Sequence, residues 1–207
     1  MNPKIRVLIA DDHSIVRMGL VTLLEMEPDL EVVGQAANGK IAVSEARRLK
    51  PDVIVMDLMM PVVNGADATT QIKSALPETK VVLFTTYPTS DLIAHALDNG
   101  ATGAIFKTAA DTELVKAIRK VAGGGTYVSA DVRKLLASDP PVEALSPRQR
   151  EILEFIVRGL SNGDIATLLG ISQTVVREHT ISLFQKIGAA NRAEAVAIAL
   201  RNHLLPI

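Results

Sequence analysis

The sequence contains no cysteine, and aromatic residues make up only 3% of its 207 residues. Without cysteine, disulfide bonds, thiolate metal sites and a cysteine nucleophile are all excluded. Few aromatic side chains leave little surface on which single-stranded nucleic acid would stack its bases. No apolar run approaches the ~18 residues of a membrane span, and the N-terminus "MNPKIRVLIADDH" lacks the pattern of a signal peptide. We therefore expect a cytoplasmic protein with no membrane partner.

Short apolar runs alternate with amphipathic segments over residues 1–122, which we expect to form the first domain. The runs are rich in valine, isoleucine and leucine and lie at 5–10, 31–36, 52–57, 80–85 and 102–106. Such runs are typical of strands that are covered on both faces of a parallel sheet. Five strands with intervening helices predict a doubly wound α/β domain around a parallel five-stranded sheet, with its site at the carboxyl ends of the strands.

Residues 123–142 interrupt this alternation. The segment "GGGTYVSADVRKLLASDPPV" has three glycines, one short helical pattern at 129–137 and then "SDPP", a composition typical of a linker. The remaining residues, 143–207, have helical periodicity and predict a small all-α domain of four helices. Ser146 and Gln149 fit a capping box at the start of its first helix. A tight turn at 169–172 joins the second helix to the third.

Three carboxylates fall at the ends of predicted strands. Asp11 and Asp12 follow the first strand, and Asp57 ends the third. Carboxylates held together at one sheet edge repel one another, and a hard divalent cation such as Mg²⁺ relieves the repulsion. Thr85 ends the fourth strand and Lys107 follows the fifth, where a phosphoryl group on Asp57 would project. The set predicts a phosphoryl-transfer site with Asp57 as nucleophile.

A simpler interpretation exists for each of these aspartates taken alone. A single aspartate at a strand end more often caps the next helix or turn than binds a metal. The joint placement of all five polar side chains at strand ends favours the phosphoryl-transfer site over separate caps.

Four stretches of the first domain, "VLIADDH", "VIVMDLMMPVVNG", "LFTT" and "GATGAIFK", resemble the signature segments of response-regulator receiver domains, whose fold is flavodoxin-like. The stretch "LSPRQREILEFIVRGLSNGDIATLLGIS", with "LFQKIG" and "NRAEAV" after it, resembles a LuxR-type helix-turn-helix domain. Together they resemble a two-component response regulator of the NarL/FixJ type over nearly the whole chain.

This resemblance implies that Asp57 accepts a phosphoryl group from a sensor histidine kinase and slowly loses it again, without enzymatic action on another molecule. The implied ligands of Mg²⁺ are Asp11, Asp12, Asp57 and the carbonyl oxygen of Met59. Thr85 and Lys107 would contact the phosphoryl group. The sequence departs from the family pattern at the switch position, where Ala104 replaces the usual aromatic residue and Phe106 is the neighbouring aromatic.

By the same resemblance, the third helix of the second domain enters the major groove of double-stranded DNA. The implied contact residues are Gln173, Thr174, Arg177, Glu178, Thr180, Ile181, Lys186 and Arg192. Residues 142–207 carry seven lysines and arginines against six acidic residues, a net charge of +1. Neutralisation of phosphates dominates affinity for DNA, so a domain with a net charge of only +1 is weakly charged for a DNA-binding domain. Gly163 and Asp164 stand where the family commonly has a Lys-Glu pair, which removes one more cation.

Two functions fit these observations. The first is a phosphorylation-controlled, DNA-binding transcription regulator that on activation forms a homodimer through the apolar face of its last helix, "AEAVAIALRNHLL". The alternative is a receiver with a degenerate effector domain that binds protein rather than DNA, and the salt dependence of DNA binding separates the two. A free-standing enzyme is disfavoured, because the sequence shows no second set of catalytic residues.

Overall fold

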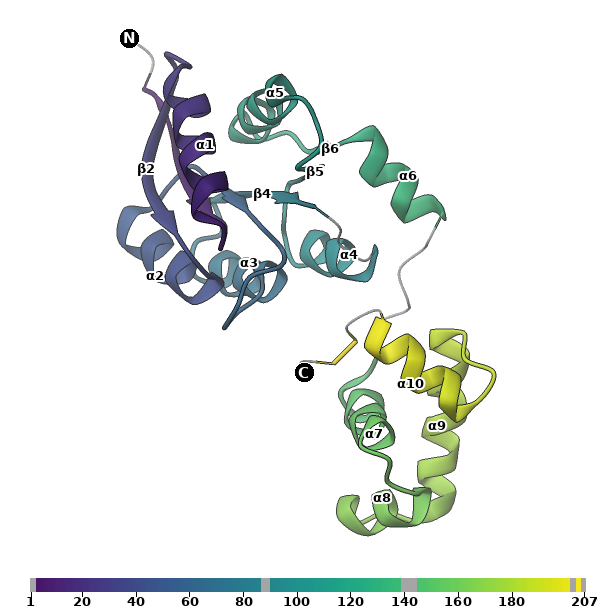
Figure 1. The fold of residues 1–207 in the computed structure, drawn as a ribbon. Coiled ribbons are helices and arrows are strands. Elements are labelled where there is room, and N and C mark those ends of the chain that lie inside the picture. The colour runs from purple at the N-terminus through teal and green to yellow at the C-terminus, as the bar shows by residue number, and fades with distance from the viewer. Residues whose placement is uncertain (1–2, 87–89, 139–144, 202–203, 206–207) are drawn as a thin grey trace. The chain divides into compact units, whose positions relative to one another are not determined.

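The computed structural model describes residues 3–86, 90–138, 145–201 and 204–205. The chain divides into two compact units, Met1–Pro140 and Pro141–Ile207 (Figure 1). Each unit has a hydrophobic core of its own. Among the described residues, no helix combines the length and the apolar character that crossing a membrane requires.

A parallel sheet of six strands, in the order β2-β1-β3-β4-β5-β6, forms the centre of the first unit. The strands are β1 (Ile5–Ala10), β2 (Leu30–Ala36), β3 (Val53–Met56), β4 (Lys80–Thr85), β5 (Gly103–Phe106) and β6 (Tyr127–Val128). Successive side chains of a strand point to opposite faces of its sheet. Val7 and Ile9 therefore pack in the core on one face, and Leu8 and Ala10 in the core on the other. Because both faces are covered, the central strand β3 is continuously apolar and all four of its residues are buried.

Helices cover both faces of the sheet, as expected for a doubly wound fold (Figure 1). One face carries α1 (Ser14–Glu25) and α5 (Asp111–Ala122), and the other carries α2 (Gly39–Leu49), α3 (Gly65–Ala75) and α4 (Ser90–Asp98). Leu24 and Ile118 are fully buried beneath the first pair. Ile72 and Ile93 are buried beneath the second group, with Val43 beside them. The predicted fold class is confirmed.

The structure of the segment after α5 differs from the prediction. Residues 123–142 were expected to be a linker, but Tyr127–Val128 pairs with β5 as a sixth strand, in place of the predicted five-stranded sheet. The expected short helix is present as α6 (Ala130–Ser138), and its Val132 is fully buried in the core of the first unit. A two-residue strand is too short to give an apolar run, so the sequence pattern missed it. Residues 139–142 lie outside the described residues.

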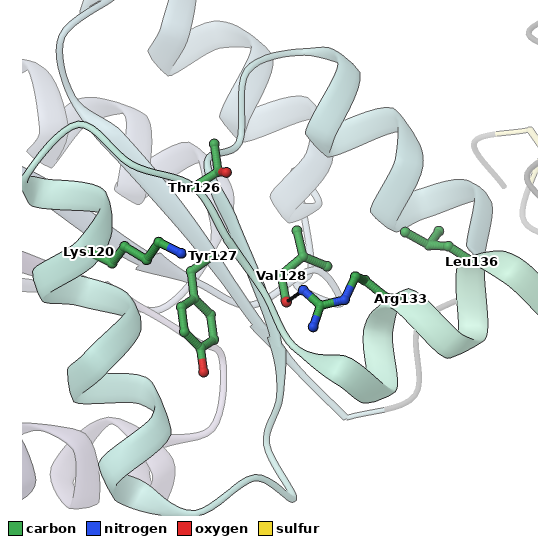
Figure 2. A pocket seen from close by; sticks show the side chains of 6 residues that line it. All are labelled: Lys120, Thr126, Tyr127, Val128, Arg133 and Leu136. Carbon is green, nitrogen blue, oxygen red and sulfur yellow. Dashed lines mark hydrogen bonds between the residues drawn. The ribbon is translucent and has the colours of Figure 1, made fainter.

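A surface hollow of about 530 Å³ lies where this added strand and helix meet α5 (Figure 2). Its two cations are already engaged within the fold. The ammonium of Lys120 lies 5.8 Å from the centroid of the Tyr127 ring, and a guanidinium nitrogen of Arg133 donates to the Val128 carbonyl. The first contact joins β6 to α5, and the second joins α6 to β6. A free linker would lack both contacts.

The residues of the second unit that the structure describes form four helices, as predicted. They are α7 (Pro147–Val157), α8 (Asn162–Leu169), α9 (Gln173–Ile187) and α10 (Arg192–Arg201). The expected capping box is present, because Ser146 Oγ accepts the Gln149 N–H at 3.2 Å and Gln149 Oε1 accepts the Ser146 N–H at 3.0 Å. Gly170 ends α8 with a φ of 63°, which a residue without Cβ adopts most easily, and the chain then turns into α9.

Candidate functional site

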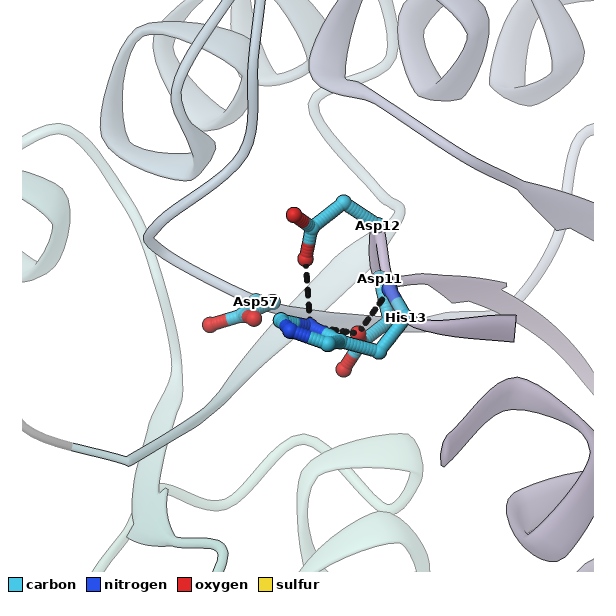
Figure 3. A group of neighbouring side chains, drawn as sticks. All are labelled: Asp11, Asp12, His13 and Asp57. Atoms are coloured by element: carbon cyan, nitrogen blue, oxygen red, sulfur yellow. Dashed lines mark hydrogen bonds and ion pairs between the residues drawn. The ribbon is translucent and has the colours of Figure 1, made fainter. Parts of the chain in front are cut away.

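Three aspartates gather at the carboxyl ends of β1 and β3 (Figure 3). Ala10 and Met56 are register partners in these neighbouring strands, so the residues after them leave the sheet at the same edge. Asp11 and Asp57 are 1% and 4% exposed, and Asp12 is partly exposed. The predicted acidic pocket is thus formed by adjacent strands, with two of its carboxylates buried.

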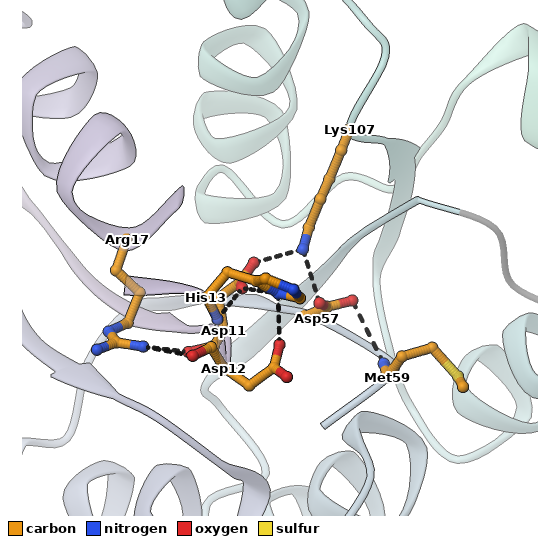
Figure 4. Close-up of polar contacts among 7 residues, drawn as sticks. All are labelled: Asp11, Asp12, His13, Arg17, Asp57, Met59 and Lys107. Carbon is orange, nitrogen blue, oxygen red and sulfur yellow. Dashed lines mark hydrogen bonds and ion pairs between the residues drawn. The ribbon is translucent and has the colours of Figure 1, made fainter. Parts of the chain in front are cut away.

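Lys107 supplies the positive charge of this pocket. Its Nζ lies 2.5 Å from Asp11 Oδ2 and donates a hydrogen bond of 2.6 Å to Asp57 Oδ2 (Figure 4). Burial alone would lower the pKa of Lys107, but the hydrogen bonds to Asp11 and Asp57 outweigh it, and the pKa is raised above its ordinary value. The side chain therefore stays an ammonium ion and links the two buried carboxylates.

Thr85 lies at the carboxyl end of β4, the strand next to β3, and Met59 contacts Asp57 directly. Thr85 ends β4 and is buried, and its Oγ1 has no hydrogen-bond partner among the described residues. An unsatisfied buried hydroxyl is costly, so this one is ready to bond a ligand oxygen. The Met59 backbone N–H donates to Asp57 Oδ1 at 3.3 Å. Gly65 lets α3 start against this strand end, because a Cβ there would lie 2.1 Å from the Asp57 carbonyl oxygen.

Two residues that were not predicted contact the acidic turn, His13 at the pocket and Arg17 on the side of the turn away from Asp57 and Lys107 (Figure 4). His13 Nδ1 lies 2.7 Å from Asp12 Oδ1 and 3.4 Å from Asp11 Oδ1 (Figure 3). Arg17 Nη1 donates to the carbonyl oxygens of Asp11, at 2.7 Å, and Asp12, at 3.2 Å (Figure 4). Arg17 follows His13 by four residues, and this helical spacing is the signal that would have pointed to it.

The donor set suits a hard divalent cation. Asp11, Asp12, His13 and Asp57 each offer a ligand atom, and these atoms all lie within 4.8 Å of one another. Carboxylate oxygens together with water and phosphate oxygens are the ligands that Mg²⁺ prefers. The three carboxylates of the pocket therefore fit Mg²⁺.

The residues predicted to contact DNA lie mainly on α9, but they differ in exposure. The exposed ones are Gln173, Thr174, Arg177, Glu178 and Ile181. Thr180 is a correction, because it is buried and its hydroxyl donates to the Val176 carbonyl at 2.7 Å. Arg192 is half-buried, and its guanidinium donates to the carbonyl of Ile156 in the last turn of α7 and to that of Leu160 just after the helix. Lys186 is half-buried in the last turn of α9.

Arg192 is therefore bound within its own domain and is not directed at a phosphate. The last carbonyls of a helix attract cations, which explains its position. Sequence spacing alone gave no sign of this partner, since the two carbonyls precede Arg192 by 36 and 32 residues.

Comparison with known families decides what this geometry belongs to. The family described as "Response regulator receiver domain" matches residues 7–119, more than half of the chain. The chain belongs to the response regulator family. The description "Bacterial regulatory proteins, luxR family" matches residues 143–199 of this response regulator. A receiver joined to a LuxR-type domain makes it a DNA-binding transcription regulator of a two-component system.

Relatives of this response regulator match it along nearly the whole chain. The response regulator protein VraR of Staphylococcus epidermidis is 36% identical over 206 residues, which cover 97% of this chain and 99% of VraR. The crystal structure of ChrA, a response regulator of a heme-sensing two-component system, is 33% identical, with a TM-score of 0.59 and coverage of 98% and 99%. A structure of two RcsB dimers bound to two parallel DNAs is 26% identical, with a TM-score of 0.68 and coverage of 96% and 98%. These likenesses favour the DNA-binding function over a degenerate effector domain.

Proposed function

We propose that Asp57 accepts the phosphoryl group that controls this response regulator, with a sensor histidine kinase as donor. The observation that carries the proposal is the setting of Asp57, a buried carboxylate at a strand end whose Oδ2 is bonded to Lys107. Its Oδ1, which accepts the longer bond from Met59, is the freer oxygen to attack. The new O–P bond forms as the N–P bond of the phosphohistidine breaks, and the electron pair and a proton go to the imidazole nitrogen.

The rest of the pocket serves this transfer. Asp11, Asp12 and Asp57, with the carbonyl oxygen of Met59, would hold Mg²⁺, which supplies positive charge against the phosphoryl oxygens. The Lys107 ammonium exchanges part of its bonding to carboxylates for a phosphoryl oxygen. Thr85 Oγ1, unpartnered among the described residues, donates to another of these oxygens.

The aspartyl phosphate that results is slowly hydrolysed by water, and the protein performs no reaction on another molecule. Charge held at Thr85 and Lys107 then biases the surrounding helices and strands between two states, which is how such a modification is transmitted. Transfer from a sensor kinase to a transcription regulator places this chemistry in the cytoplasm.

For DNA, we propose that α9 enters the major groove with its exposed residues. These are Gln173, Thr174, Arg177, Glu178 and Ile181. Arg177 contributes a permanent positive charge, and the Glu178 carboxylate accepts a hydrogen bond from a cytosine amino group. Lys186 lies at the far end of the helix, where the phosphate backbone passes. The intramolecular bonds of Thr180 and Arg192 leave both residues out of this interface.

The weak charge of the domain favours binding as a homodimer, because two copies double the contacts to a two-fold symmetric site. On α10, Ala195, Ile198 and Ala199 are buried in the core of their own domain. The apolar surface of the helix that is left for a second copy is therefore smaller than predicted. Leu200, 45% exposed, and the half-buried Val196 remain for a partner. The RcsB structure, which contains dimers on DNA, supports this arrangement.

The test combines phosphorylation with DNA binding. The purified protein is treated with acetyl phosphate and Mg²⁺, and the mass of the intact chain reports the phosphoryl group. Fluorescence anisotropy then follows binding to a site selected from a random DNA pool, over a range of salt concentrations. We expect a phosphoprotein that binds a two-fold symmetric site more tightly than the unmodified protein, with an affinity that falls steeply as salt rises.

Matched variants identify the residues responsible. Asp57→Asn should take no phosphoryl group, whereas Asp98→Asn, an exposed aspartate at the end of α4, should behave as the natural protein. Arg177→Gln should weaken DNA binding, and Lys134→Gln, the same loss of charge at an exposed position of α6, should not. Phosphorylation of Asp57→Asn would refute the assignment of the acceptor, and absence of DNA binding in both states at low salt would refute the DNA function.

A further inference from the structure

A single guanidinium holds the turn that carries two of the three acidic residues. Arg17 lies in α1, and its Nη1 donates at once to the carbonyl oxygens of Asp11 and Asp12, at 2.7 and 3.2 Å. Both bonds come from a cation, and charge-assisted hydrogen bonds are about twice as strong as neutral ones. The side chain is half-buried, so water competes with these bonds less than at an open surface.

Other bonds of the same turn fix its direction. Asp11 Oδ1 accepts the His13 backbone N–H at 2.9 Å, and the Arg17 N–H donates to the His13 carbonyl at 3.1 Å as α1 begins. Figure 4 shows Arg17 on one side of the turn and Asp57 and Lys107 on the other. Because the carbonyls are bonded to Arg17, the carboxylates of Asp11 and Asp12 are the groups left to face the pocket.

We propose that Arg17 is a positioning residue for the magnesium site, which it serves by holding the β1–α1 turn so that Asp11 and Asp12 are placed before the ion binds. The proposal rests on the Mg²⁺ site of the proposed function. Preorganisation matters because a ligand that must first be ordered costs affinity. Groups that orient metal ligands through hydrogen bonds typically contribute 10- to 100-fold to metal affinity.

The sign of the effect separates positioning from simple electrostatics. Arg17 is a cation near a cation site, so its charge alone repels Mg²⁺. If charge were its only influence, removal of that charge would tighten Mg²⁺ binding. If Arg17 positions the turn, its removal weakens Mg²⁺ binding in spite of the relieved repulsion.

The experiment is a calorimetric titration of the full-length protein with MgCl₂ alone, with no phosphoryl donor present. Arg17→Gln keeps a polar side chain but lacks the reach and the charge to bond both carbonyls. We expect its Kd for Mg²⁺ to rise roughly 10- to 100-fold. Arg17→Lys restores the charge and one donor group, so its Kd should lie between those of Arg17→Gln and the natural protein.

Arg6, which lies on β1, offers a matched control. Its Nη1 donates to the Lys50 carbonyl at 2.9 Å, the same kind of bond at the opposite end of β1. Arg6→Gln should therefore leave the Kd for Mg²⁺ unchanged, whatever it does to the melting temperature. Asp12→Asn should lose most Mg²⁺ binding, because it removes a proposed ligand.

The outcomes distinguish this inference from the proposed function. An unchanged or lower Kd for Arg17→Gln, with Mg²⁺ binding lost in Asp12→Asn, would overturn the role of Arg17 and leave the magnesium site in place. Absence of Mg²⁺ binding to the natural protein would overturn both. If circular dichroism shows Arg17→Gln to be unfolded, Arg17→Lys decides, and a Kd equal to that of the natural protein would overturn the proposal.

Discussion

Replacement of Lys107 by methionine tests the electrostatics of the pocket. Methionine keeps an unbranched side chain of similar length but lacks the ammonium that Asp11 and Asp57 contact at 2.5 and 2.6 Å. Removal of one partner from a buried ion pair typically costs 3–5 kcal/mol, because the remaining charge stays buried and uncompensated. The Lys107 side chain is 12% exposed, so some water reaches it. We therefore expect the lower end of this range, about 3 kcal/mol without metal.

Mg²⁺ should lower this cost, whereas pH should leave it unchanged over the neutral range. In Lys107→Met, Mg²⁺ brings positive charge to the same carboxylates without competing with an ammonium. Saturating MgCl₂ should therefore reduce the difference in stability between the variant and the natural protein to below about 1 kcal/mol. The pKa of Lys107 is raised above its ordinary 10.5. Its stabilising contribution is thus complete below pH 10.5 and is lost as the pH rises through the higher folded-state pKa. The cost of Lys107→Met should stay constant from about pH 6 to 9.

The assay is urea unfolding followed by circular dichroism, with EDTA and with MgCl₂. Lys116→Met is the control, because it makes the same change of charge and side chain at an exposed position of α5. Its effect should stay within about 0.5 kcal/mol in both buffers. A loss for Lys107→Met that is equal in EDTA and MgCl₂, or below about 1 kcal/mol in EDTA, would refute the electrostatic reasoning.

Three further predictions concern other parts of the chain. Val62 is 76% exposed with a φ of 73°, a conformation that disfavours a β-branched residue, so Val62→Gly should stabilise the first unit by roughly 1 kcal/mol in urea unfolding; a loss of stability would contradict this. Val132→Ala should cost about 2 kcal/mol in the same assay, because the side chain is fully buried, whereas a linker helix would lose almost nothing. Gly163→Lys adds a cation near Gln173, whose flexible side chain must shift. It should steepen the plot of log affinity for DNA against log salt concentration by about 0.9. An unchanged slope would place this position away from the phosphates.

Local patterns in the sequence predicted the main elements of both units. The apolar runs of β1, β3 and β4 exist because strands covered on both faces bury side chains that point to either side of the sheet. The aspartates follow those runs directly, and parallel strands present their carboxyl ends at one edge, so the pocket followed from chain order alone. Ser146 and Gln149 likewise marked the start of α7, because a capping box involves only neighbouring residues.

Contacts between residues far apart in the sequence were decided only by the tertiary structure. Tyr127–Val128 is a strand only because β5 has a free edge beside it, and Val132 is buried only because the core of the first unit receives it. Arg192 turns to carbonyls that precede it by more than 30 residues. The sequence by itself thus determined which candidate groups this response regulator offers for the proposed phosphoryl transfer and DNA contacts, since residue types and local periodicity encode them. Folding decided which polar groups are already bonded within the protein, because hydrogen-bond partners depend on distances in space.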